Sequence, residues 1–124
     1  MKAVFVADDR GAHYAEWIVK AYKTVETRRK NMLRLLVGER VAVVRTGNGR
    51  KPMIVGYVDI VSSSFCASAE EFQKNFYKHL VPYWSNYYTN ANGKWFYHLA
   101  NAEECTPYPL PENAVRHGRS WCEF

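Results

Sequence analysis

The chain has 124 residues and a mass of 14.4 kDa, which is the size of one domain, so a single domain over residues 1–124 is expected. Hydrophobic residues make up 48% of it and charged residues 23%, which excludes a disordered or low-complexity chain. The 17 Lys and Arg residues outnumber the 12 Asp and Glu residues, and the net charge of +5 favours a polyanionic partner.

The sequence shows no sign of membrane insertion or export. It contains no apolar run near the roughly 18 residues that a membrane-spanning helix needs. The apolar stretch at residues 3–7 ends at two aspartates, which excludes a signal-peptide core. We therefore expect a cytoplasmic protein without a membrane partner. Its three cysteines form no CxxC motif and its four histidines have no metal-like spacing, so reduced thiols and neither a metal nor a cofactor are expected.

The first third of the chain predicts a strand, a helix and a second strand. Residues 2–7 are a β-branched and aromatic run typical of a strand. Apolar residues then recur at helical spacing from about residue 13 to 22, which predicts a helix that packs on a sheet. From residue 24 to 28 the pattern has a period of two, so a strand follows, with Glu26 and Arg28 on one face.

The middle of the chain predicts a β-hairpin. A short apolar turn or helix at residues 32–36 precedes two strands, residues 40–46 and 53–61, which a Gly-rich turn connects. Gly56 stands inside the second strand and predicts a bulge or a sharp bend there.

A third helix signal follows the hairpin. Residues 68–71, Ser-Ala-Glu-Glu, have the spacing of a capping box, and Pro82 ends the helix that they start. The inner face of this helix is expected to carry Phe72, Phe76 and Leu80.

The last third predicts short extended segments at residues 94–99, 107–111 and 120–124. Five or six short strands interrupted by two or three helices predict an α+β fold, a small, partly closed β-barrel decorated by the helices. An open α+β sandwich is the alternative, which periodicity alone does not separate from the barrel.

Positive charge is concentrated in residues 20–51, which hold ten basic residues against two acidic ones, a net charge of +8, while the rest of the chain carries −3. A nucleic-acid footprint has this asymmetry, although a solvated surface of strands and turns gives it too. Four aromatics stand in a polar, Asn-rich loop: Tyr83, Trp84, Tyr87 and Tyr88. They either stack on bases, with Trp84 and Tyr87 as the candidates, or cover the mouth of the barrel.

Residues 22–28, 37–41 and 55–58 resemble the ASCH domain of the PUA-like superfamily, and the C-terminal residues 96–101 and 118–121 resemble the end of that domain. In that family a Lys, a Glu three residues later and an Arg two beyond it follow the first helix, and Lys23, Glu26 and Arg28 have this spacing. The resemblance implies a β-barrel with a cleft beside the first helix, into which the three side chains project, and RNA or nucleotide binding there.

Some members of that family are enzymes, namely ribonucleases and amidohydrolases that deacetylate modified cytidines. At the position three residues after the Lys, the amidohydrolases carry a nucleophilic Thr, whereas this chain has Glu26. That departure disfavours amidohydrolase chemistry. Thr24, on the same strand face as Glu26, is a candidate substitute nucleophile that nothing else in the sequence supports.

Residue chemistry agrees with a role in a cleft. A carboxylate between two cations is held ionised, and it can accept a hydrogen bond from the exocyclic amine of a base while Lys or Arg binds phosphate. The alternative is a structural ion pair between Glu26 and Arg28 that closes one end of the barrel.

The leading hypothesis is a non-catalytic module that binds RNA, single-stranded, or a nucleotide. Its expected contacts are phosphate binding by Lys23, Arg28, Arg29 and Lys30, hydrogen bonding by Glu26, and stacking by Trp84 and Tyr87. The alternative is a hydrolase on the same cleft, a ribonuclease before an amidohydrolase, with Glu26 as general base and Lys23 as a cationic stabiliser.

Overall fold

The computed structural model describes residues 1–85, 87–88 and 93–124. Its strands are β1 (Lys2–Ala7), β2 (Val25–Arg28), β3 (Arg40–Thr46), β4 (Met53–Cys66), β5 (Lys94–Pro109), β6 (Val115–His117) and β7 (Trp121–Glu123). Its helices are α1 (Tyr14–Val19), the 3-10 helix η1 (Arg34–Leu36), α2 (Ala69–Lys74) and α3 (Phe76–His79). Among these described residues, no helix is long and apolar enough to cross a membrane.

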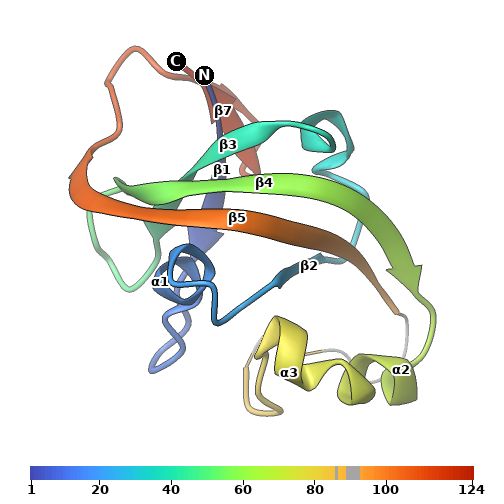
Figure 1. The fold of residues 1–124 in the computed structure, drawn as a ribbon. Coiled ribbons are helices and arrows are strands. Elements are labelled where there is room, and N and C mark those ends of the chain that lie inside the picture. The colour runs from blue at the N-terminus through green and yellow to red at the C-terminus, as the bar shows by residue number, and fades with distance from the viewer. Residues whose placement is uncertain (86, 89–92) are drawn as a thin grey trace.

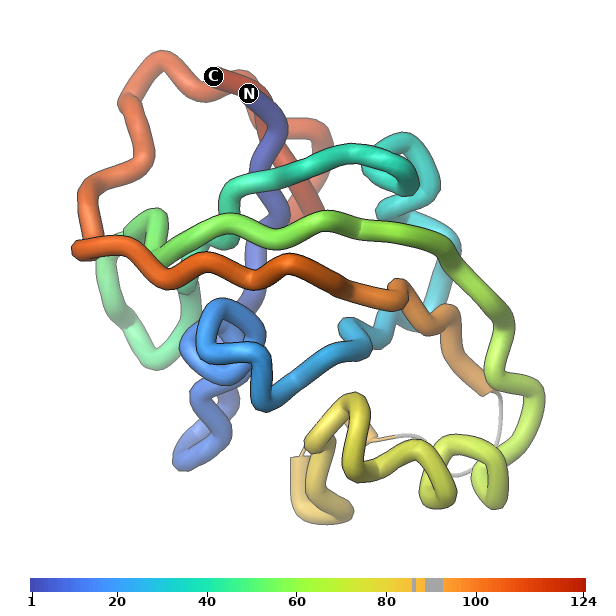
Figure 2. The backbone as a smooth tube through the Cα atoms, viewed as in Figure 1, coloured from blue at the N-terminus to red at the C-terminus, as the bar shows by residue number. Residues whose placement is uncertain are grey.

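The described strands form one seven-stranded sheet in the order β2-β5-β4-β3-β1-β7-β6 (Figure 1). Strands β1 and β3 pair in parallel, and the other neighbouring strands are antiparallel. The two chain ends lie side by side, where the Phe124 N–H donates to the Met1 carbonyl at 2.9 Å (Figure 2). The α+β fold class is therefore confirmed.

The predicted barrel needs correction, because the sheet is curved but not closed. In the part of the chain that the structure describes, no strand pairing joins β2 to the other end of the sheet. Side-chain contacts cross the gap instead: Arg28 of β2 donates from Nη2 to the carbonyl oxygen of Phe5 in β1 at 2.6 Å, and the Ser120 hydroxyl lies 3.0 Å from the Met32 sulfur. The gap between β2 and β1 is therefore bridged by a guanidinium rather than by a ladder of backbone hydrogen bonds.

The strand count also differs from the predicted five or six. The segment predicted at residues 107–111 is largely the end of the long strand β5, and β6 was missed. Strand β4 runs on to Cys66, because it stays paired with β5 through a polar serine run that hides the alternating pattern. The strands predicted at residues 2–7 and 40–46 are confirmed with those boundaries.

The bulge predicted at Gly56 is confirmed, and it brings α1 close to the sheet. The β4–β5 register shifts between Ile54 and Gly56. A Cβ atom at Gly56 would lie 2.7 Å from Cγ1 of Val19 in α1 and would collide with the backbone oxygen of Glu103 in β5. Glycine at this position therefore lets α1 pack directly against β4 and β5.

The helix predicted after residue 68 begins as expected but breaks in the middle. The Ser68 hydroxyl accepts a hydrogen bond from the Glu71 N–H at 3.1 Å, which confirms the predicted cap. The Asn75 side chain then donates to the Glu71 carbonyl at 2.8 Å and separates α2 from α3. After this break Phe76 is 47% exposed, contrary to the prediction, whereas Phe72 before it and His79 after it are fully buried.

Candidate functional site

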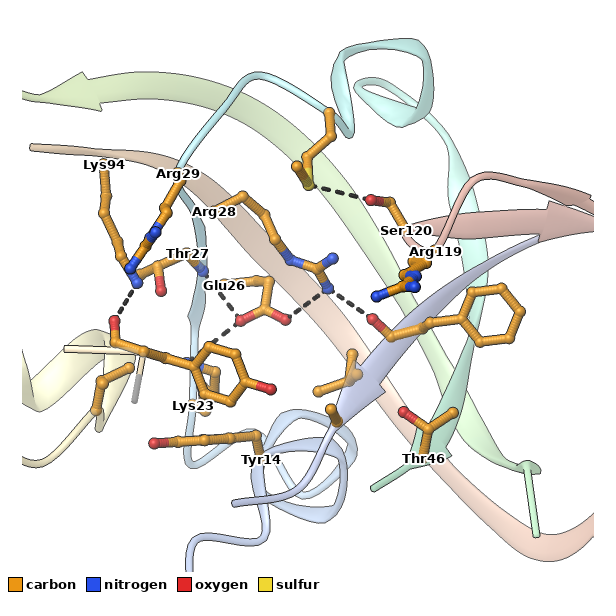
Figure 3. A pocket seen from close by; sticks show the side chains of 16 residues that line it. Tyr14, Lys23, Glu26, Thr27, Arg28, Arg29, Thr46, Lys94, Arg119 and Ser120 are labelled. Atoms are coloured by element: carbon orange, nitrogen blue, oxygen red, sulfur yellow. Dashed lines mark hydrogen bonds and ion pairs between the residues drawn. The ribbon is translucent and has the colours of Figure 1, made fainter. Parts of the chain in front are cut away.

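A cavity of about 560 Å³ opens at the gap between β2 and β1 (Figure 3). Tyr14 of α1 lines it, so the cavity lies beside the first helix. Of the described residues that line it, six are charged: Lys23, Glu26, Arg28, Arg29, Lys94 and Arg119. Five cations thus surround one carboxylate, and the Lys, Glu and Arg of the sequence motif all reach the same cavity.

Glu26 stands at the centre of these charges and is 9% exposed. Its Oε1 accepts from the Thr27 N–H at 3.0 Å and lies 3.6 Å from the Lys23 Nζ, while Oε2 accepts from Arg28 Nη2 at 3.1 Å. Burial by itself raises the pKa of this carboxyl, but Arg28 and Lys23 outweigh burial and hold the pKa below its ordinary value. Glu26 is therefore an ionised acceptor, and its Oε2 can accept one more hydrogen bond.

Lys23 lies on the floor of the cavity rather than at its rim. Helix α1 ends at Val19, and Ala21, two residues later, has a positive φ of 64°. The Lys23 N–H then donates to the Trp17 carbonyl, so the side chain turns inward. Its Nζ donates to the carbonyl oxygen of His79 in α3 and lies 5.0 Å from the centre of the Tyr14 ring. Burial lowers the pKa of Lys23 to about 8, even though Glu26 favours the charged form.

The sequence left open whether Arg28 lies in a cleft or forms a structural ion pair, and the structure shows that it does both. It lines the cavity, and it also links β2 to β1 through its bond to the Phe5 carbonyl. Because one of its Nη atoms serves both Glu26 and Phe5, this guanidinium is held in place before any ligand binds.

Sequence reasoning missed Lys94 and Arg119, which lie far from residues 20–51. Lys94 begins β5 and is buried, with its Nζ donating to the backbone carbonyl of Tyr87. Burial, together with repulsion from nearby cations, lowers its pKa to about 8 in spite of Glu26. Arg119 stands in the turn before β7 and lines the cavity from the β1 side. Only the folded sheet brings these two residues to the motif.

Only part of the basic segment of residues 20–51 reaches the cavity. Arg40 is ion-paired with Asp59 at 3.0 Å and with Glu103 at 2.9 Å, and Lys20 is paired with Glu16 at 3.0 Å. Lys30 is exposed but does not line the cavity. Within the segment, which the structure describes in full, only Lys23, Arg28 and Arg29 contribute positive charge to the lining of the cavity.

The loop aromatics divide between different environments. Tyr87 lines the cavity and contacts Tyr14 edge-on, with ring centroids 6.0 Å apart. Trp84 packs under the Arg10 guanidinium, 4.7 Å from its ring centroid, and does not line the cavity. Tyr88 packs against the core. Part of the loop, residues 86 and 89–92, lies outside the described residues.

Thr24, the substitute nucleophile considered above, is exposed and does not line the cavity. Its N–H donates to the Lys78 carbonyl, and its own carbonyl accepts from the Leu99 N–H, both at 2.9 Å. A reaction in the cavity that uses the Thr24 hydroxyl is not supported by this placement.

The sequence matches no protein-family profile and no curated protein. The structure, by contrast, is similar to solved structures of the ASCH protein of Zymomonas mobilis. The unmodified protein is 16% identical with a TM-score of 0.68, covering 87% of this chain and 73% of that chain. A serine-to-alanine mutant is 17% identical with the same TM-score of 0.68, covering 87% of this chain and 74% of the other. The chain therefore has the fold of the ASCH domain.

Proposed function

We propose that this protein is an RNA-binding module that holds a nucleotide of single-stranded RNA in the cavity between β2 and β1, without catalysing a reaction. The observation that carries the proposal is the charge of that cavity, where five cationic side chains surround the single carboxylate of Glu26. The general link between this fold and RNA binding supports the same assignment.

The cations favour a ligand with phosphate groups. Lys23 and Lys94 have pKa values of about 8, so both are mostly protonated at neutral pH. Repulsion from Arg28 and Arg29 contributes to the lowered pKa of Lys94, which means that positive charge is crowded here. A phosphate near these groups relieves that repulsion through charge-assisted hydrogen bonds.

The remaining walls suit a nucleobase. Tyr87 lines the cavity and offers aromatic surface on which a base can stack. Glu26 Oε2, which accepts one hydrogen bond from the described residues, has the capacity to accept another from an N–H donor, such as the exocyclic amine of adenine, cytosine or guanine. We therefore propose that Glu26 contacts the base.

The hydrolase alternative needs a general base, and Glu26 is poorly suited to that task. Its pKa is held below its ordinary value, whereas an effective general base has a pKa near the working pH. Lys23 favours the alternative, because a pKa of about 8 leaves a neutral amine available in mild alkali. RNA cleavage that survives repeated purification would replace the binding proposal with a ribonuclease.

The first test is incubation with a mixed pool of single-stranded RNA, scored for both retention and cleavage. We expect retention without cleavage, and an affinity that falls with salt with a log–log slope of about −0.7 for each phosphate contacted. Binding that is independent of salt, or no retention at low salt, would contradict the proposal.

A matched pair of variants tests the aromatic wall. Tyr87→Ala is expected to weaken RNA binding by about 1–3 kcal/mol, because Tyr87 lines the cavity and is 40% exposed. Trp84→Ala is the control, since Trp84 is similarly exposed at 39% but packs on Arg10 outside the cavity. Fluorescence anisotropy gives the affinities and thermal melting the stabilities. Equal losses of affinity in both variants would show that Tyr87 has no special role.

A further inference from the structure

The cations of the cavity fall into two groups that differ in how they are partnered. Lys23, Arg28 and Lys94 each donate to a backbone carbonyl, and the first two also pair with Glu26. Arg29 and Arg119 are exposed, and within residues 1–85, 87–88 and 93–124 neither has a hydrogen-bond or ion-pair partner. These two guanidiniums are the rim arginines, and they are free to bind an anion.

The rim arginines stand on opposite sides of the gap. Arg29 directly follows β2, whereas Arg119 precedes β7, which pairs with β1 through Val4 and Trp121. Arg28 crosses between the two sides, so the Glu26–Arg28 pair lies between the rim arginines, as Figure 3 shows. A ligand that rests on Glu26 therefore has one unpartnered guanidinium on each side of it.

The positive charge continues outward from each rim arginine. Lys30 follows Arg29 and is exposed. On the other side, the Arg116 guanidinium lies 4.7 Å from the centre of the Phe5 ring, and Phe5 lines the cavity. Further cations thus lie next to the cavity on both sides of the gap.

This arrangement distinguishes two kinds of ligand. A terminal mononucleotide carries its phosphate on one side of the sugar, whereas a nucleotide inside a strand has a phosphate on both its 5′ and its 3′ oxygen. We propose that the cavity takes an internal nucleotide of single-stranded RNA, with Arg29 and Arg119 each binding one of the two flanking phosphates. The inference rests on the proposed function and specifies its ligand.

Adenosine 5′-phosphate, adenosine 3′-phosphate and adenosine 3′,5′-bisphosphate are the probes for the test, titrated by NMR into the full chain at low salt. The bisphosphate is expected to bind at least about tenfold tighter than either monophosphate, because it alone occupies both guanidiniums. Arg29→Gln and Arg119→Gln should each weaken binding of the bisphosphate. Each variant should also weaken binding of one monophosphate and leave binding of the other unchanged, with a different monophosphate affected in each variant. Arg34→Gln is the control, since Arg34 is exposed in η1 and does not line the cavity.

The affinity of the same variants for a single-stranded RNA oligonucleotide is then measured as a function of salt concentration. Each rim substitution should reduce the log–log salt slope by about 0.7, and the double variant by about twice that, because different phosphates are lost. The inference fails if the bisphosphate binds no better than a monophosphate, if both variants weaken the same monophosphate, or if the RNA slope is unchanged. Failure of every probe and of RNA to bind would instead remove the proposed function itself.

Discussion

Replacing Glu26 by Gln is expected to lower the free energy of unfolding by about 3–5 kcal/mol, because two cations at the cavity then lose their compensating charge. Lys23 is fully buried and 3.6 Å from the Glu26 carboxylate, and Arg28 is 3.1 Å from it. Chemical denaturation at pH 7 measures the change. Glu70→Gln is the control, since Glu70 is an exposed partner of Lys74 and should contribute less than about 1 kcal/mol.

A second variant shows whether the cost arises from the unpaired charge. Adding Lys23→Met to Glu26→Gln should recover a large part of the lost stability, because the buried ammonium is then removed with its partner. A Glu26→Gln cost below about 1 kcal/mol, or no recovery in the double variant, would show that the buried ion pairs contribute little.

Assays of RNA binding and cleavage on folded Glu26→Gln protein also distinguish between the functions proposed for this carboxylate. As a binding residue it should contribute about 1–3 kcal/mol to RNA affinity. As a general base it would instead contribute about 10²–10⁴-fold to a cleavage rate, with little effect on binding. A third outcome is a loss of stability with no change in RNA affinity or cleavage, and a loss that is not additive with that of Arg28→Ala. That outcome would show that Glu26 and Arg28 form only a structural ion pair.

Raising the pH from about 8 to about 9.5 is expected to stabilise the protein, relative to its Lys94→Met variant, by about 2 kcal/mol. The pKa of Lys94 falls from an ordinary 10.5 to about 8 on folding. Between these values the unfolded chain still binds the proton that the folded chain has released, so the free energy of unfolding rises with pH. Lys23→Met should remove a similar increment, because Lys23 has the same ordinary pKa and a folded value of about 8.

Urea denaturation at several pH values measures this effect. Comparison with the variants is needed because burial raises the pKa of the Cys66 and Cys122 thiols, which makes stability fall with pH in the same range. A pH dependence that is identical in the parent protein and in both lysine variants would contradict the burial of the two amines. Binding of an anionic ligand should weaken over this same range, since phosphate favours the protonated lysines.

Much of the local structure could be predicted from the sequence, because it depends on residues close together in the chain. The strands at residues 2–7 and 40–46, the bulge at Gly56 and the cap at Ser68 were all predicted. Each of them follows from alternation, from the backbone freedom of glycine or from a hydrogen bond spanning three residues. The motif of Lys23, Glu26 and Arg28 is local in the same sense.

The local sequence pattern did not predict the break between α2 and α3 or the burial of Lys23. The helix after Ser68 was predicted as one piece because Phe72 and Phe76 have helical spacing. The Asn75 side chain breaks it by bonding to the Glu71 carbonyl, and Phe76 is left exposed. The buried state of Lys23 was equally hidden, since a lysine in a sequence is read as exposed unless its partners are known.

The sequence by itself thus determined the α+β class, the elements around the motif and the three motif residues. Only the tertiary structure decided that the sheet stays open, that Arg28 bridges β2 to Phe5, and that Lys94 and Arg119 join the site. The physical reason is that these features depend on which distant segments meet when a long, curved sheet folds back on itself. That meeting is set by strand register and curvature summed over the whole sheet, and no short stretch of sequence encodes it.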